Sequence, residues 1–249
     1  GAIAAAIMAL VADLTRDQHR TKAMAMIGMS IGLSFAVAMV VGPLIAGAAG
    51  LAGVFYSTSL LALVGIALVA LVVPSPQQAQ HHRDAGVARG AFLPALRNAD
   101  LLRLNYGIAV LHALLMACFV ALPLALQEHA GLPREQHWWV YLAGLLLSFI
   151  GMVPLIIYAE RQRKIKRVVL GAILLLALVQ PMMWLSAASL PWLVAAIVLF
   201  FIAFNVLEAT LPSLLSKIAP AGSKGTAMGI YSTSQFAGAA LGGVLGGAV

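Results

Sequence analysis

Three polar side chains interrupt the apolar stretches of this chain at positions where they can take part in chemistry. Glu208 and Asn205 lie three residues apart in the apolar stretch 192–215, so a helix places them on one face, one turn apart. His112 lies at similar depth in the apolar stretch 104–126. Burying a charge near the middle of a bilayer costs about 2.5–3.5 kcal/mol, so such residues usually have a function.

A carboxyl group in a low-dielectric setting can take up a proton from one side and release it when a cation binds. We therefore predict Glu208 as a site for protons and cations and Asn205 as its orienting neighbour. His112 is its partner if the two stretches adjoin. The alternative interpretation is a buried polar network that fixes the kink at Pro212.

The elements that must position these residues are helices that cross a membrane. Hydrophobic residues make up 62% of the chain and charged residues 9%, which is far from the composition of a soluble domain. A span needs roughly 20 apolar residues. We count eight apolar stretches, of which the first is short: 1–12, 23–49, 53–73, 104–126, 138–158, 168–188, 192–215 and 227–249.

Positive charge falls in alternate gaps between these stretches. Fourteen of the 15 Lys and Arg residues lie in the gaps 13–22, 74–103, 159–167 and 216–226, and the other is Arg134. Short loops rich in Lys and Arg stay in the cytoplasm, so we predict a multi-pass protein of the cytoplasmic (inner) membrane with these gaps inside. The four Trp residues mark the outer helix ends. The net charge of +7 then needs no nucleic acid partner.

The polar interval 74–100 divides the chain into two groups of helices. We predict residues 1–73 as three spans of a first bundle, 74–100 as a cytoplasmic linker whose last part is helical, and 101–249 as five spans of a second bundle. Both chain ends lie in or beside apolar stretches, so we expect a fragment. Repeated helical bundles joined by a long linker are typical of secondary transporters.

Small residues recur three to four apart in the stretch 23–49 and again in 227–249, which permits close helix packing. The stretch 38–47 (Ala-Met-Val-Val-Gly-Pro-Leu-Ile-Ala-Gly), with Gly42, Pro43 and Gly47, resembles the antiporter motif of drug–proton antiporters in the major facilitator superfamily. That motif has glycine where this chain has Met29, Ala38 and Ala46. Further stretches of similarity are 12–15 with Arg20, 152–160, 204–209, 212–214, 219–221 and 224–229.

The resemblance covers essentially the whole chain and implies helices four to eleven of a twelve-helix all-α transporter. It implies that the helices of His112 and Glu208 adjoin, and that Asp13 and Arg20 belong to a latch for the outward-facing state. The alternative for Asp13 is a helix-end carboxylate balanced by Arg16 and Arg20. The binding cavity is expected near the midplane, between the two bundles.

The function expected from these features is proton-coupled export of small lipophilic or cationic compounds by alternating access. The expected partners are a small-molecule substrate and the lipid bilayer. We expect a monomer that binds no metal and no cofactor and draws its energy from the proton gradient. No nucleophile motif, phosphate loop or metal cluster favours an enzyme. The alternatives are a transporter of the same fold for a sugar, amino acid or siderophore, or a non-transporting membrane fragment.

Overall fold

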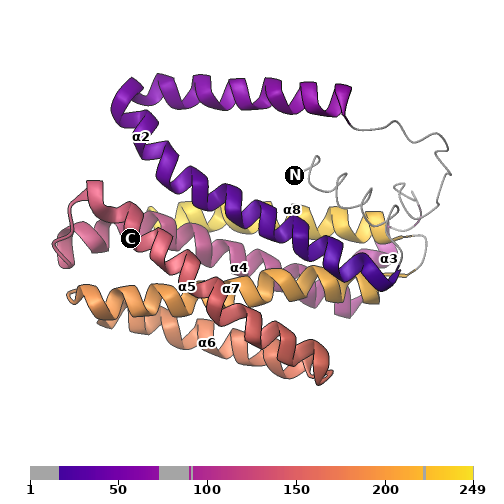
Figure 1. The fold of residues 1–249 in the computed structure, drawn as a ribbon. Coiled ribbons are helices and arrows are strands. Elements are labelled where there is room, and N and C mark those ends of the chain that lie inside the picture. The colour runs from indigo at the N-terminus through magenta and orange to yellow at the C-terminus, as the bar shows by residue number, and fades with distance from the viewer. Residues whose placement is uncertain (1–16, 73–89, 91, 221–222, 249) are drawn as a thin grey trace.

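The computed structural model describes residues 17–72, 90, 92–220 and 223–248, and at 17–29, 31, 35, 36 and 39 only the helical backbone. Regular structure in these residues is helical throughout (Figure 1), which confirms the predicted all-α fold. The first apolar stretch and residues 73–89 of the linker lie outside this part. The elements are α2 (Asp17–Leu71), α3 (Phe92–Arg97), α4 (Ala99–Leu124), the π-helical turn η1 (Ala125–His129), the 3-10 turn η2 (Arg134–Gln136), α5 (His137–Arg161), α6 (Ile165–Leu185), α7 (Leu190–Ile218) and α8 (Lys224–Gly246).

Five of the described helical segments are long and apolar enough to cross a membrane: Val40–Leu71, Ala99–His129, Arg134–Arg161, Ile165–Leu185 and Leu190–Ile218. The predicted span 227–249 is not among them, because α8 is rich in Gly, Ser and Thr and its mean hydropathy is lower. It nevertheless packs alongside α4 in the bundle (Figure 1).

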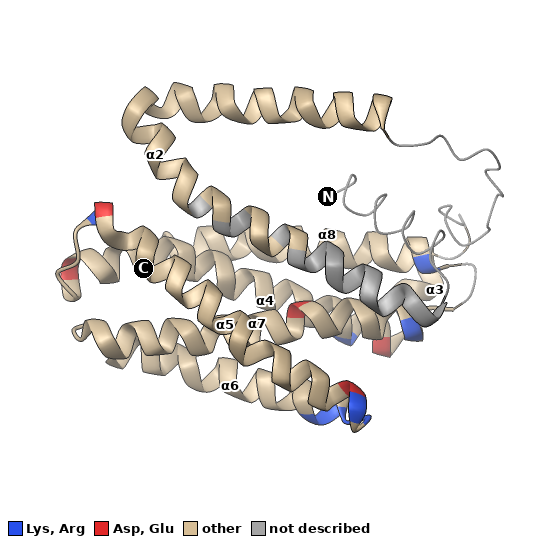
Figure 2. Cartoon of the chain, viewed as in Figure 1, with Lys and Arg blue, Asp and Glu red and all other residues tan. Residues whose placement is uncertain are grey.

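Basic residues of the described helices gather at one end of the bundle. Figure 2 shows blue segments near α3, at the start of α8 and at the turn between α5 and α6, and one basic segment at the opposite end, in the connection between α4 and α5. The Trp residues lie at the helix ends away from the basic end: Trp138 and Trp139 begin α5, Trp184 ends α6 and Trp192 begins α7. This is the separation that the alternating charge pattern predicts.

Helix α2 changes direction at Gly50, inside the gap predicted between two apolar stretches. Gly50 has φ 65° and ψ −170°, a left-handed conformation that favours glycine. Gly42 and Gly47 lie on the first arm with Pro43 between them. A Cβ added at either glycine would have no described atom within 4 Å. Close packing through the antiporter motif therefore stays a prediction.

The start of α4 is fixed by a capping residue. The Asn98 side-chain oxygen accepts hydrogen bonds from the backbone N–H groups of Asp100 (3.0 Å) and Leu101 (3.1 Å), which satisfies two donors that the first turn leaves free. Asn98 also separates α4 from the short α3, which forms where the linker was predicted to become helical. The cap determines where α4 begins, and so how far along it His112 stands.

Helix α7 lies in the middle of the described bundle and packs against α4, α5 and α6. It is buried on several sides, with Leu193, Ile197, Phe200, Val206 and Leu215 nearly inaccessible. A helix that is apolar all round is expected in such a central position. Its one carboxylate, Glu208, therefore lies on the helix that the rest of the described bundle surrounds.

Three glycines of α8 form a seam with three alanines of α4. Gly238, Gly242 and Gly246 face Ala109, Ala113 and Ala117, each four residues apart and in the same chain direction. A Cβ at Gly238 or Gly242 would overlap the alanine backbone, and one at Gly246 would lie 2.7 Å from the Ala117 Cα. Small residues at this spacing let two membrane helices approach to backbone contact.

Gly242→Ala is expected to lower the melting temperature of the purified chain in detergent, because the added methyl group must push α8 away from α4. Overpacking of this kind typically costs about 1–3 kcal/mol. The matched control is Gly243→Ala, one position along the same helix, where an added Cβ meets open space. Equal melting temperatures for the two variants would show that the seam is not tightly packed.

Candidate functional site

Three helices bring Glu208, His112 and Gln235 together at similar depth. Glu208 stands ten residues before the end of α7 at Ile218, which is about 15 Å along the axis. Gln235 stands eleven residues after the start of α8, or about 16 Å, and His112 thirteen residues after the start of α4, or about 20 Å. All three therefore lie near the middle of a hydrocarbon core of about 30 Å.

The Gln235 amide lies between the other two side chains. Its Nε2 is 2.7 Å from the His112 Nε2 and 3.4 Å from the Glu208 Oε1. The His112 Nε2 is 3.9 Å from the Glu208 Oε2, which is longer than a hydrogen bond. The predicted proximity of Glu208 and His112 is thus present in the structure, and the closest contact of each is with Gln235.

The tautomer of His112 is assigned from its contacts, with the Gln235 amide nitrogen placed toward the ring. Because an amide nitrogen only donates, the His112 Nε2 must accept from Gln235 through its lone pair. The ring proton is then on Nδ1, where it donates to the backbone oxygen of Ile108 at 3.3 Å. The remaining Gln235 N–H donates to the Glu208 Oε1. The arrangement is that of a neutral imidazole beside a carboxylate, with an amide linking them.

An aromatic ring borders this cluster. The Phe204 ring lies 5.6 Å from the His112 ring, between ring centroids and tilted at 60°. The His112 side chain is 12% exposed, whereas that of Glu208 is 38% exposed. The Tyr231 hydroxyl is buried on α8, within electrostatic range of Glu208. The Glu208 Oε2 is itself buried and has no hydrogen-bond partner among the described residues.

Asn205 makes its hydrogen bond away from Glu208. Its Nδ2 donates to the Ser148 Oγ on α5 at 2.8 Å, and the Ser148 hydroxyl donates in turn to the Leu145 backbone oxygen at 2.6 Å. Ser148 is 0% exposed. Asn205 therefore ties α7 to α5 one turn from Glu208, so any orienting effect on the carboxylate acts through the helix.

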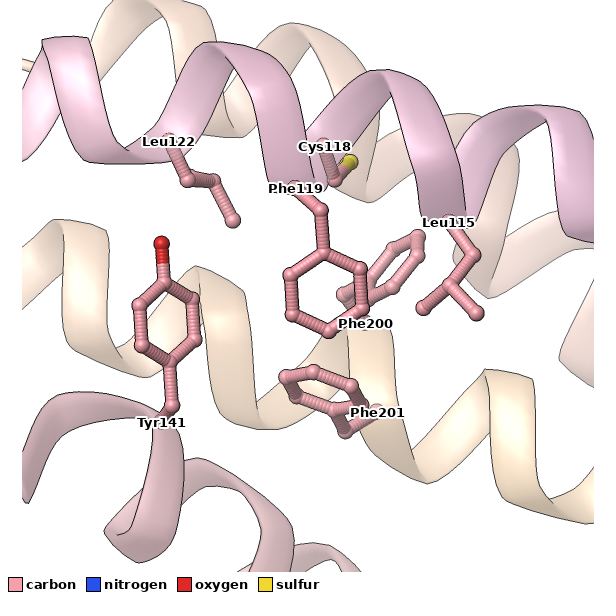
Figure 3. Close-up of a pocket in the computed structure, with 7 residues that line it drawn as sticks. All are labelled: Leu115, Cys118, Phe119, Leu122, Tyr141, Phe200 and Phe201. Carbon is pink, nitrogen blue, oxygen red and sulfur yellow. The ribbon is translucent and has the colours of Figure 1, made fainter. Parts of the chain in front are cut away.

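A second feature between α4, α5 and α7 is a small apolar pocket (Figure 3). Its lining residues are Leu115, Cys118, Phe119, Leu122, Tyr141, Phe200 and Phe201. It is too narrow to admit a water molecule, so we assign it no substrate. Cys118 is buried there, with its sulfur 4.0 Å from the Gln180 side-chain oxygen. This matches the packing role expected of a cysteine inside a helix.

Not every candidate residue can be placed. Asp13 lies outside the described residues, and for Arg20 only the helical backbone is described, so the latch stays a prediction. Gln235 was not among the candidate site residues, although it contacts two of them. The signal in the sequence was the one amide side chain of α8, a helix otherwise rich in Gly, Ala, Ser and Thr.

Ser148→Ala is expected to destabilise the bundle by about 1–3 kcal/mol, because the half-buried Asn205 amide loses its acceptor. The measurement is the melting temperature in detergent of Ser148→Ala, Asn205→Leu and the double variant. Since the two residues share one hydrogen bond, their effects should not add. Ser216→Ala is the control, because that hydroxyl bonds only within its own helix. Additive effects on the melting temperature would show that Asn205 and Ser148 do not stabilise the bundle through a shared hydrogen bond.

Known proteins similar to this chain are membrane transporters. The chain is 52% identical over 247 residues to the inner membrane transport protein YajR of Escherichia coli strain K12, which covers 99% of this chain and 54% of that protein. It is 34% identical over 240 residues to an uncharacterized transporter of Buchnera aphidicola subsp. Acyrthosiphon pisum, covering 96% and 61%. It is 34% identical over 248 residues to one of subsp. Schizaphis graminum, covering 99% and 63%.

The chain thus spans between 54% and 63% of the length of these relatives. Residues 1–243 also match the family profile described as Major Facilitator Superfamily. Both findings confirm the resemblance noted in the sequence at the level of the superfamily. With its helices and apolar spans, the chain belongs to the Major Facilitator Superfamily of membrane transport proteins.

Proposed function

We propose that the complete protein exports small lipophilic or cationic compounds in exchange for protons, with Glu208 as the group that carries the proton. The observation that carries this proposal is a carboxylate at mid-depth of the central helix, beside an imidazole and an amide of two neighbouring helices. A group buried at such depth is usually functional in membrane proteins.

The chemistry of exchange follows from competition for one carboxylate. A protonated Glu208 is neutral and tolerates its apolar surroundings, whereas an ionised Glu208 needs a positive partner. A proton and a cationic substrate therefore exclude each other at the same site. The apolar rings nearby, such as that of Phe204, favour a cation with a large apolar body over a strongly hydrated one.

Direction and topology complete the proposal. With the basic helix ends in the cytoplasm, Glu208 alternately faces each side as the bundles rock around a central site. Asp13 and Arg20 would latch the outward-facing state, and the antiporter motif with Gly42, Pro43 and Gly47 would pack the first bundle tightly. The protein would work as a monomer in the inner membrane.

Glu208→Gln in the complete protein is expected to abolish proton movement that is triggered by cations, because an amide cannot exchange a proton. The measurement is collapse of the pH gradient in inverted membrane vesicles on adding a panel of lipophilic cations. Glu160→Gln is the matched control, since Glu160 is an exposed carboxylate near the end of α5.

The outcomes separate the alternatives. Collapse that is lost only in Glu208→Gln supports proton antiport through this site. Collapse that survives the substitution would return Glu208 to a structural role. No collapse with any cation, in a protein that is correctly inserted, would favour another cargo such as a sugar, amino acid or siderophore, or a protein that does not transport.

A further inference from the structure

Gln235 is the one described side chain that hydrogen-bonds to both titratable members of the site, and the proposed exchange gives it no role. It reaches them from a third helix, α8, with a single nitrogen 2.7 Å from His112 and 3.4 Å from Glu208. Both amide hydrogens are therefore engaged, one by each neighbour. The other polar residues of this part of α8 differ: Thr233 and Ser234 bond to backbone oxygens of their own helix.

The amide controls what His112 can do. A proton added at the His112 Nε2 would occupy the position where the Gln235 N–H now donates, so Gln235 would have to turn or withdraw. Without Gln235, the protonated Nε2 would be 3.9 Å from the Glu208 Oε2 and free to close onto it. An imidazolium and a carboxylate in an apolar setting form a strong charge-assisted hydrogen bond.

We propose that Gln235 is a positioning residue that holds His112 neutral and keeps the imidazole and the Glu208 carboxylate from closing into an ion pair. This inference rests on the proposed function, because it matters for transport only if Glu208 exchanges a proton for a cation. A carboxylate already neutralised by His112 would bind a proton or a cation only weakly.

The groups facing Gln235 are consistent with this role. Glu208 faces it from α7 and His112 from α4, and Tyr231 adds a buried hydroxyl on α8 itself. The other charged residues of these three helices in the described part are Asp100, Arg103, Lys217 and Lys224, which stand in the terminal turns at the basic end. Among the described residues at this depth, Glu208 and His112 are therefore the two side chains that can take up the proton. Gln235 favours protonation of Glu208 over protonation of His112.

The test replaces Gln235 by a residue of similar shape that cannot donate. Gln235→Met removes both hydrogen bonds while largely filling the same volume. The complete protein is produced with 15N-labelled histidine and placed in lipid nanodiscs. The ring nitrogen signals of His112, assigned by their loss in His112→Phe, report its tautomer and its charge directly at pH 7.

We expect the wild-type His112 to be neutral with its proton on Nδ1. In Gln235→Met we expect the ratio of imidazolium to neutral imidazole to rise by roughly two- to tenfold, the factor that a lost hydrogen bond typically gives. The rise should vanish when Glu208→Gln is added, because the imidazolium then has no carboxylate to pair with. Thr233→Ala is the matched control and should leave the His112 signals unchanged.

The proposal is overturned if His112 is charged in the wild type, if Gln235→Met leaves its charge unchanged, or if Thr233→Ala changes it equally. Should Gln235→Met fold poorly, Gln235→Asn withdraws the amide by one methylene and must change the signals in the same direction. These signals need no transport, so the vesicle experiment can fail while the positioning role of Gln235 is upheld. That combination would reject proton antiport only.

Discussion

The contact between the glycines of α8 and the alanines of α4 is the interaction on which the site depends. Backbone contact along Gly238, Gly242 and Gly246 fixes α8 against α4 in parallel. It leaves Gln235 close enough for its amide to reach the His112 ring and the carboxylate of α7. If larger residues widened the seam, the 2.7 Å contact between Gln235 on α8 and His112 on α4 would be lost. Packing of small residues thus determines the chemistry of a polar cluster.

The cluster is a compromise between stability and function. An ionised carboxylate at mid-depth destabilises the bundle by about 2.5–3.5 kcal/mol on insertion scales. The amide of Gln235 offsets part of that cost without neutralising the charge. Full pairing with His112 would stabilise the site further and remove the reason for a proton or a cation to bind there. The proposed exchange needs the weaker arrangement, in which the Gln235 amide and not a charged His112 contacts Glu208.

The sequence identified two titratable residues of the site but not the residues that contact them. Glu208 and His112 were identifiable because a titratable side chain is rare in an apolar stretch, and helical rise placed them at similar depth. Which helices adjoin is decided by side-chain packing, which spacing along one chain does not encode. Hence Asn205, which was predicted to orient Glu208, bonds instead to Ser148 on α5. The side chain that contacts Glu208 is that of Gln235 on α8. The low hydropathy of α8 likewise reflects its glycine seam.

The most direct test of the central claim is proton release on cation binding by the complete protein, purified in detergent and followed with a pH indicator in weak buffer. If a proton and a cation compete for the Glu208 carboxylate, saturating lipophilic cation should release up to about one proton per bound cation, and none in Glu208→Gln. Cation binding without proton release in the wild type, or equal release from Glu208→Gln, would contradict exchange at Glu208.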